Sequence, residues 1–153
     1  MKKDFLVAEH SLYKTWTNMR SRCINIKASN YSNYGGRGII VCDRWLERNG
    51  QGFRNFVLDV GDKPTGKTLD RIDNNGNYEP GNVRWATPTL QNINRRVGSY
   101  NRSGYKGVYW HVGRQLWRSQ ITAYGKHRHL GDFVDKKDAI KARLIAEQTL
   151  SIG

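Results

Sequence analysis

The sequence predicts an α+β fold made of two small domains joined by a short linker. An apolar stripe at helical spacing in residues 11–25 predicts a helical scaffold at the N-terminal end. Residues 67–96 follow the order strand, loop, strand, helix, and residues 105–150 predict a three-stranded antiparallel sheet packed on one C-terminal helix. We therefore expect domains at 1–96 and 105–153. The linker is expected at 97–104, where polar residues and glycines concentrate.

The first domain is expected to begin with two helical segments. The stripe in residues 11–25 predicts the first helix, with Ser11 as its N-cap and an apolar face made of Leu12, Trp16, Met19 and Cys23. Residues 43–61 predict a second segment whose apolar residues are Trp45, Phe53, Phe56 and Val57. Gly50 and Gly52 can interrupt this segment, because glycine disfavours a helix interior.

A ββα unit follows these helices. Residues 67–86 predict two short strands around a loop rich in Asn, Gly and Pro. Thr87 and Pro88 are expected as the N-cap and first residue of a helix over 88–96, because proline is favoured at the first helical position.

The second domain is expected to be a small sheet with one covering helix. Strands are predicted at 105–112, 116–124 and 127–133, with glycines in the turns between them. The final helix is predicted over 135–150, and its apolar face is expected to contain Ala139, Ala142, Leu144, Ile145 and Ala146. Packing this helix on the sheet would bury the apolar face of each element.

The charge of the chain indicates a polyanionic partner. The 153 residues contain 26 Lys and Arg against 13 Asp and Glu, a formal net charge of +13, and residues 1–96 and 97–153 are both basic. Lysine and arginine release counterions from phosphates, so we expect nucleic acid as the partner. No apolar run is long enough to span a bilayer, and the short apolar stretch at residues 5–8 does not predict a signal peptide. We expect no membrane partner and a cytoplasmic location.

Three polar residues of the ββα unit are candidates for phosphodiester chemistry. A carboxylate at the end of the first strand, Asp70, and an amide on the helix, Asn92, can share one divalent cation. Such a cation polarises a phosphate and stabilises the leaving oxygen. Asn82 is expected to hold the intervening loop by hydrogen bonds. Asx residues in turns are also common for purely conformational reasons, and that alternative stays open.

The stretch LDRIDNNGNYEPGNVRWATPTLQNINRR at residues 69–96 resembles the HNH (ββα-metal) nuclease motif in the form common in phage-encoded endonucleases. The segment YGGRGIIVCDRW at residues 34–45 resembles the same family. The resemblance implies Asp70 and Asn92 as ligands of Mg²⁺ or Mn²⁺ and Asn82 as the structural asparagine. It also implies that Arg84 and Arg95 contact DNA.

The chain departs from this family at residue 71, where the general base is usually histidine. Arg71 stays charged and cannot accept a proton, so it is expected to hold phosphate instead. A branch of HNH restriction enzymes also has arginine here and is thought to use a tyrosine, which makes Tyr34 a candidate, with Arg37 as a phosphate clamp. His10 is a second candidate base. A nuclease fold that binds DNA without cutting is the open alternative.

Zinc is not expected in this chain. HNH relatives often carry cysteine pairs that hold a structural zinc ion, but Cys23 and Cys42 form no CxxC motif. Two buried thiols are the preferred interpretation.

Residues 103–148 resemble the DNA-binding domain of plant ethylene-response factors of the APETALA type. The matching features are YKGVYW, a tryptophan that opens the second strand, HLGDF, and a helix that starts with DKKDA. The resemblance implies that the sheet lies in the major groove of duplex DNA. The DNA-facing positions would be Lys106, Tyr109, His111, Gln120, Thr122, His127 and His129, and strand alternation adds Arg118. Most of the plant arginines and tryptophans are absent, so the plant target sequence does not carry over.

These observations predict an HNH-type DNA endonuclease, of the homing or nicking kind, that uses one divalent metal ion. We expect it to be encoded by a bacteriophage, to act in the bacterial cytoplasm, and to be a monomer that can pair on DNA. One alternative is a sequence-specific DNA-binding protein or regulator with a silent HNH scaffold. Another is an RNA-binding module, because basic sheets with exposed aromatic residues also stack unpaired bases.

Overall fold

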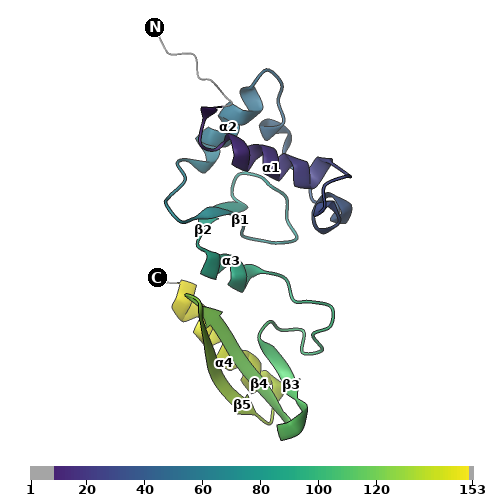
Figure 1. The fold of residues 1–153 in the computed structure, drawn as a ribbon, viewed down its shortest axis with the longest axis vertical. Coiled ribbons are helices and arrows are strands. Elements are labelled where there is room, and N and C mark those ends of the chain that lie inside the picture. The colour runs from purple at the N-terminus through teal and green to yellow at the C-terminus, as the bar shows by residue number, and fades with distance from the viewer. Residues whose placement is uncertain (1–8, 152–153) are drawn as a thin grey trace. The chain divides into compact units, whose positions relative to one another are not determined.

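The structure, a computed structural model, describes residues 9–151, and the chain divides into two compact units between Ala86 and Thr87 (Figure 1). Each unit is described by itself below. Both helices and antiparallel strands are present, so the α+β prediction is confirmed. The apolar stretch at residues 5–8 lies outside the described residues. Among the described residues, none of the helices is both long and apolar enough to cross a membrane.

The first unit begins with helix α1, Tyr13–Ile24, whose buried face is the predicted stripe. Leu12 and Met19 are almost completely buried, and Trp16 and Cys23 are buried beside them. The predicted N-cap at Ser11 is wrong, because the helix starts after Leu12 without a side-chain cap. The backbone N–H of Leu12 donates instead to Nδ1 of His10, at 3.1 Å.

The second predicted helical segment is divided in two. A 3₁₀ turn, η4 (Asp43–Trp45), is followed by helix α2, Gln51–Val60. Gly50 precedes α2 with a φ of 76°, a left-handed conformation that glycine adopts without a steric penalty. A Cβ atom on Gly52 would lie 2.6 Å from the carbonyl oxygen of Trp45, so the close approach of η4 and α2 requires glycine there.

The core of the first unit is largely aromatic. Trp45, Phe53 and Phe56 are fully buried, and the rings of Trp45 and Phe56 meet edge to face with centroids 5.2 Å apart. Two short turns, η2 (Tyr31–Asn33) and η3 (Gly35–Arg37), precede the segment at 39–41. Buried residues of that segment belong to this core.

The two strands of the ββα unit are confirmed. Strands β1 (Thr68–Arg71) and β2 (Val83–Ala86) pair antiparallel, with Asp70 opposite Arg84. The loop between them pairs with the segment at 40–42, where Val41 and Tyr78 form a parallel bridge. This pairing fixes the loop on the unit's core, because Tyr78 is itself buried.

Helix α3, Pro88–Asn94, opens the second unit with the predicted cap. The hydroxyl of Thr87 accepts from the N–H of Leu90 at 3.2 Å, and proline occupies the first helical turn. This helix was expected in the first domain, but its contacts are mainly with residues of the second unit. Within that unit the N–H of Tyr124 donates to the hydroxyl of Thr89 at 3.1 Å.

The rest of the second unit is the predicted sheet and helix. Strands β3 (Val108–His111), β4 (Leu116–Ala123) and β5 (Lys126–Phe133) form an antiparallel sheet in the order β3-β4-β5 (Figure 1). A 3₁₀ turn, η5 (Val112–Arg114), joins β3 to β4, and helix α4 (Lys136–Ser151) packs on the sheet. Alternation along β4 predicts that Trp117, Ser119 and Ile121 face the helix, and Ser119 and Ile121 are buried, together with Ala123, whereas Trp117 is half-buried.

The predicted apolar face of α4 is partly wrong. Ala139 is fully buried, but Leu144 and Ile145 are 38% and 55% exposed, while Arg143 is 3% exposed. The helix turns the stripe 139, 142, 143 and 146 toward the sheet, which leaves Leu144 and Ile145 on the other side. Arg143 is accommodated because its guanidinium donates to the carboxylate of Glu147 and to the carbonyl of Gln120.

Replacing Phe56 with Ala should lower the free energy of unfolding of the first unit by roughly 3–5 kcal/mol, because a fully buried ring leaves a cavity. Urea denaturation followed by tryptophan fluorescence measures this. Leu58→Ala is the matched control on the same helix, since Leu58 is 75% exposed and its loss should change stability by less than about 0.5 kcal/mol. Equal effects of the two substitutions would contradict the described core.

Candidate active site and nucleic-acid interface

The loop between β1 and β2 is held by one side chain, Asn82. Its Oδ1 atom accepts from the N–H of Asp73 at 2.8 Å, and its Nδ2 atom donates to the carbonyl of Asn77 at 2.7 Å and to that of Asp73 at 3.3 Å. These bonds span the whole loop, as expected of an asparagine that holds the hairpin. Asp73 contributes an Asx turn, because its Oδ1 accepts from the N–H of Asn75 at 2.8 Å.

Asp70 lies at the end of β1 beside this loop and pairs with Arg84 across the hairpin. The guanidinium of Arg84 contacts Oδ2 of Asp70 at 3.3 Å, and the two side chains are 33% and 13% exposed, respectively. The expected metal ligand and one expected DNA contact are therefore brought together. The pair places a carboxylate and a guanidinium side by side on the two strands that flank the loop.

Arg71, which was expected to hold phosphate, is buried. It is only 6% exposed, and its guanidinium carbon lies 5.0 Å from the ring centroid of Tyr34 and 4.8 Å from that of Tyr78. Both distances are within the range of a cation–π interaction. Arg22 also lies over Tyr34, with its guanidinium carbon 5.3 Å from the ring centroid. Tyr34 is thus in direct contact with the residue that follows Asp70.

Arg37 joins the segment after Tyr34 to the ββα loop. Its guanidinium donates to Oδ1 of Asn75 at 2.6 Å and to the carbonyl of Asn74 at 3.4 Å. Arg37 is half-buried, so part of its side chain is open to solvent. These contacts bring Tyr34, Arg37 and the loop after Asp70 into one region of the first unit.

His10 has different neighbours. Its Nδ1 accepts from the N–H of Leu12, and its ring meets that of Phe53 edge to face, with centroids 5.4 Å apart. These contacts belong to the start of α1 and to the aromatic core. They give His10 a structural function that the sequence pattern did not indicate.

Asn92, the other expected metal ligand, lies on α3 in the second unit. Its Oδ1 accepts from Nζ of Lys106 at 3.0 Å. Burial, together with the nearby charges of Arg143 and Arg95, lowers the pKa of Lys106 to about 8. Lys106 therefore lies half-buried beside Asn92 rather than extending freely from the sheet. Arg95 is the residue at which α3 ends.

The chemistry of the expected donor set suits a hard cation. Asp70 and Asn92 offer oxygen atoms, and Mg²⁺ is commonly bound by one or two such protein groups together with water and phosphate oxygens. Within residues 9–151, no three His, Cys, Asp or Glu side chains gather into a group that could hold a metal ion. Cys23 and Cys42 are free thiols whose pKa values are raised by burial.

The sheet of the second unit brings most of the expected DNA-facing residues onto one surface. The register places Tyr109 opposite Arg118, Gln120 opposite His129, and Thr122 opposite His127. Oε1 of Gln120 accepts from the hydroxyl of Tyr109 at 3.3 Å and lies 2.9 Å from Nε2 of His127. The hydroxyl of Thr122 lies 3.1 Å from the other ring nitrogen of His127. This surface is a connected polar network.

Asp132 is a component of this surface that the sequence analysis missed. Its carboxylate accepts two hydrogen bonds from Arg118, at 2.7 and 3.0 Å, and one from Arg114, at 3.0 Å. Nε2 of His129 lies 3.7 Å away. Hydrogen bonding from Arg118 lowers the pKa of Asp132 to about 2. The sequence pattern did not indicate this contact, because the register that places Asp132 opposite Arg118 includes an irregularity between Ser119 and Gln120.

His111 lies at the end of β3, where Nδ1 accepts from the N–H of Arg114 at 3.2 Å. It thereby caps the turn η5 between β3 and β4. The same contact holds Arg114 close to the surface that carries Arg118.

Asp132→Asn should flatten the acid dependence of stability. The pKa of Asp132 is lowered from 3.8 to about 2 in the folded state, so its ionised form stabilises the fold above about pH 4. That contribution is lost as the pH falls toward 2. The fall in thermal midpoint between pH 5 and pH 2.5 should be smaller in Asp132→Asn than in the unchanged protein, measured by circular dichroism. Asp138→Asn, an exposed carboxylate of the same unit, is the control. An unchanged acid dependence in Asp132→Asn would contradict this assignment.

The chain is similar to Protein 3.8 of Escherichia phage T7. The two are 37% identical over 67 residues, which is 43% of this chain and 55% of the phage protein. The chain thus spans about half the length of this relative. No family model matches the sequence, and no solved structure matches it. The similarity supports a bacteriophage origin.

Proposed function

We propose that the protein is a divalent-metal-dependent DNA endonuclease of the HNH type, of the homing or nicking kind. We propose further that it is phage-encoded and acts in the cytoplasm of the bacterial host. The observation that carries the proposal is the loop held by Asn82 directly after Asp70, in a strand–loop–strand segment followed by the helix that carries Asn92. A net charge of +13 supports a nucleic acid as the substrate.

In this proposal Asp70 is the ligand of Mg²⁺ or Mn²⁺ in the first unit. Asn92, the second ligand that the resemblance implies, belongs to the second unit, where its Oδ1 accepts from Lys106. The bound cation supplies charge stabilisation for the phosphate and the leaving oxygen. Arg84 neutralises Asp70 when no cation is bound, through the contact at 3.3 Å. If a cation took the place of Arg84 beside Asp70, the guanidinium of Arg84 could contact a phosphate of the DNA instead.

Tyr34 is the preferred candidate for positioning or activating the nucleophile. It contacts Arg71, the neighbour of Asp70 in the sequence, and Arg37 joins the following turn to the ββα loop. His10 contacts Leu12 and Phe53 instead, so its surroundings favour a structural function. Arg71 carries a permanent charge and cannot act as a base. Its burial favours a packing function over the phosphate contact that the sequence analysis expected.

The second unit would supply affinity and site preference. It has 12 Lys and Arg against 4 Asp and Glu, and its sheet presents Arg118 and Arg114 beside a set of amide, hydroxyl and imidazole groups. These groups can donate to and accept from base edges in a major groove. We expect duplex DNA as the partner, bound by a monomer that can pair on DNA.

A DNA-binding protein or regulator with a silent scaffold is the second candidate. The observation that favours it is the burial of Arg71 between Tyr34 and Tyr78. At the position where the resemblance implies a general base, this chain has a residue that packs against two rings.

Asp70→Asn should abolish metal-dependent nicking while DNA affinity stays within a few-fold. Loss of this carboxylate weakens binding of the cation that stabilises charge at the reacting phosphate, so we expect a fall in rate of at least about 100-fold. The measurement is conversion of a supercoiled plasmid library with random inserts to open circles, with Mg²⁺, Mn²⁺ or EDTA. Asp62→Asn is the control, because Asp62 is an exposed carboxylate outside the ββα unit.

Two outcomes would contradict the nuclease proposal in different ways. Normal nicking by Asp70→Asn would show that the metal assignment is wrong. Plasmid that is bound but not cut under every metal condition would favour the silent scaffold. If nicking is observed, Tyr34→Phe and His10→Gln then separate the two candidates for the nucleophile's partner.

A further inference from the structure

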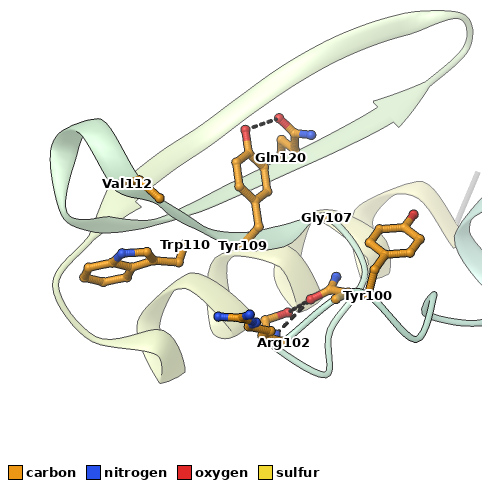
Figure 2. Close-up of a pocket in the computed structure, with 9 residues that line it drawn as sticks. Tyr100, Arg102, Gly107, Tyr109, Trp110, Val112 and Gln120 are labelled. Carbon is orange, nitrogen blue, oxygen red and sulfur yellow. Dashed lines mark hydrogen bonds between the residues drawn. The ribbon is translucent and has the colours of Figure 1, made fainter.

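We propose that a groove beside β3 binds one unstacked nucleobase of the DNA. The groove has a volume of about 420 Å³ and is lined by residues 100–103, by β3 and by Gln120 (Figure 2). That volume lies within the usual range for small-ligand sites. The inference rests on the proposed function in one respect: the base belongs to the nucleic acid that the chain is proposed to bind.

The groove is surrounded by aromatic side chains that are open to solvent. Tyr100 is 89% exposed, Trp110 is 44% exposed and Tyr109 is 37% exposed. Aromatic rings stack on the faces of bases, and a base face becomes accessible only when the base leaves the helical stack. A fully paired duplex presents base edges and phosphates instead. The exposed rings therefore fit an unpaired or extruded base better than a paired one.

Polar groups on the rim fit the remaining parts of a nucleotide. Arg102 is an exposed cation on the groove and can contact the adjacent phosphate. Oε1 of Gln120 is held by the Tyr109 hydroxyl, and its amide nitrogen points away from that ring (Figure 2). An amide in this orientation can donate to the edge of a base.

The loop that forms one side of the groove is rigidly built. Ser103 is 6% exposed, and its hydroxyl contacts Oδ1 of Asn101 and the carbonyls of Tyr105 and Val108, at 2.6–2.8 Å. Gly107 has a φ of 73°, and a Cβ atom there would collide with the guanidinium of Arg143. The chain therefore passes close to α4 at this point. These contacts fix the backbone from which the exposed side chains of Tyr100 and Arg102 extend, so the backbone of this side of the groove needs no ordering when a ligand binds.

The test compares two DNA duplexes that are identical except for one bulged, unpaired thymidine. Affinities are measured by fluorescence anisotropy at one fixed salt concentration with EDTA, so that no cleavage occurs. The full-length protein should bind the bulged duplex about fivefold or more tightly than the paired one, the range expected for one stacked base. Tyr100→Ala and Trp110→Ala should remove this preference and leave the affinity for the paired duplex within about twofold.

Two control variants test whether stacking is responsible. Tyr100→Phe keeps the ring and should keep the preference for the bulged duplex. Tyr124→Ala removes a tyrosine that is 69% exposed at the turn between β4 and β5, outside the groove, and should also keep the preference. Thermal unfolding of each variant shows that the second unit remains folded.

The outcomes separate this proposal from the proposed function. Equal affinity of the unchanged protein for both duplexes overturns the nucleobase groove, and so does an equal loss of preference in Tyr100→Ala and Tyr124→Ala. Either result leaves the nuclease proposal standing if the paired duplex is bound and nicked. Failure to bind either duplex overturns both proposals together.

Discussion

The packing of the Arg71 guanidinium against two tyrosine rings is the interaction on which the arrangement of the first unit depends. Tyr34 comes from the segment before the core, Tyr78 from the loop of the ββα unit, and Arg71 from the end of β1. A buried guanidinium is costly unless aromatic faces and hydrogen bonds compensate for lost water. This contact therefore ties the segment that carries Tyr34 to the β1–β2 hairpin, beside Asp70.

The surroundings of Arg71 connect the fold to the chemistry. Asn82 holds the loop after β1 from within, and Arg37 holds the same loop from the neighbouring segment. The loop that follows Asp70 is thus restrained on both sides, which limits the orientations open to the end of β1. In the proposed function this restraint would serve a metal ligand and a silent scaffold equally well, so the hydroxyl of Tyr34 is the feature that would separate the two.

The second unit combines strong positive charge with local neutralisation. Asp132 sits among Arg114, Arg118 and His129 and keeps the planar guanidinium of Arg118 in a fixed orientation. In the proposed function, an arginine held in this way would lose less side-chain entropy on contacting DNA, at the cost of one negative charge on the surface. The groove beside β3 is different in character, because exposed rings rather than charges dominate it. In the proposed function the polar network would contact base edges, and the groove, which shares Tyr109 and Gln120 with it, would hold the face of one base.

Most helices and strands could be predicted from the sequence, because their signals are local. The stripe of Leu12, Trp16, Met19 and Cys23, the Thr87 cap and the alternation along β4 depend only on the spacing of apolar and capping residues. The contacts of the charged residues, by contrast, depend on how the elements pack. Arg143 is buried in place of Leu144 and Ile145, because partners on β4 and on its own helix satisfy its guanidinium. The burial of Arg71, the place of Asp132 and the groove at Tyr100 likewise depend on residues distant in the chain, which no local periodicity encodes.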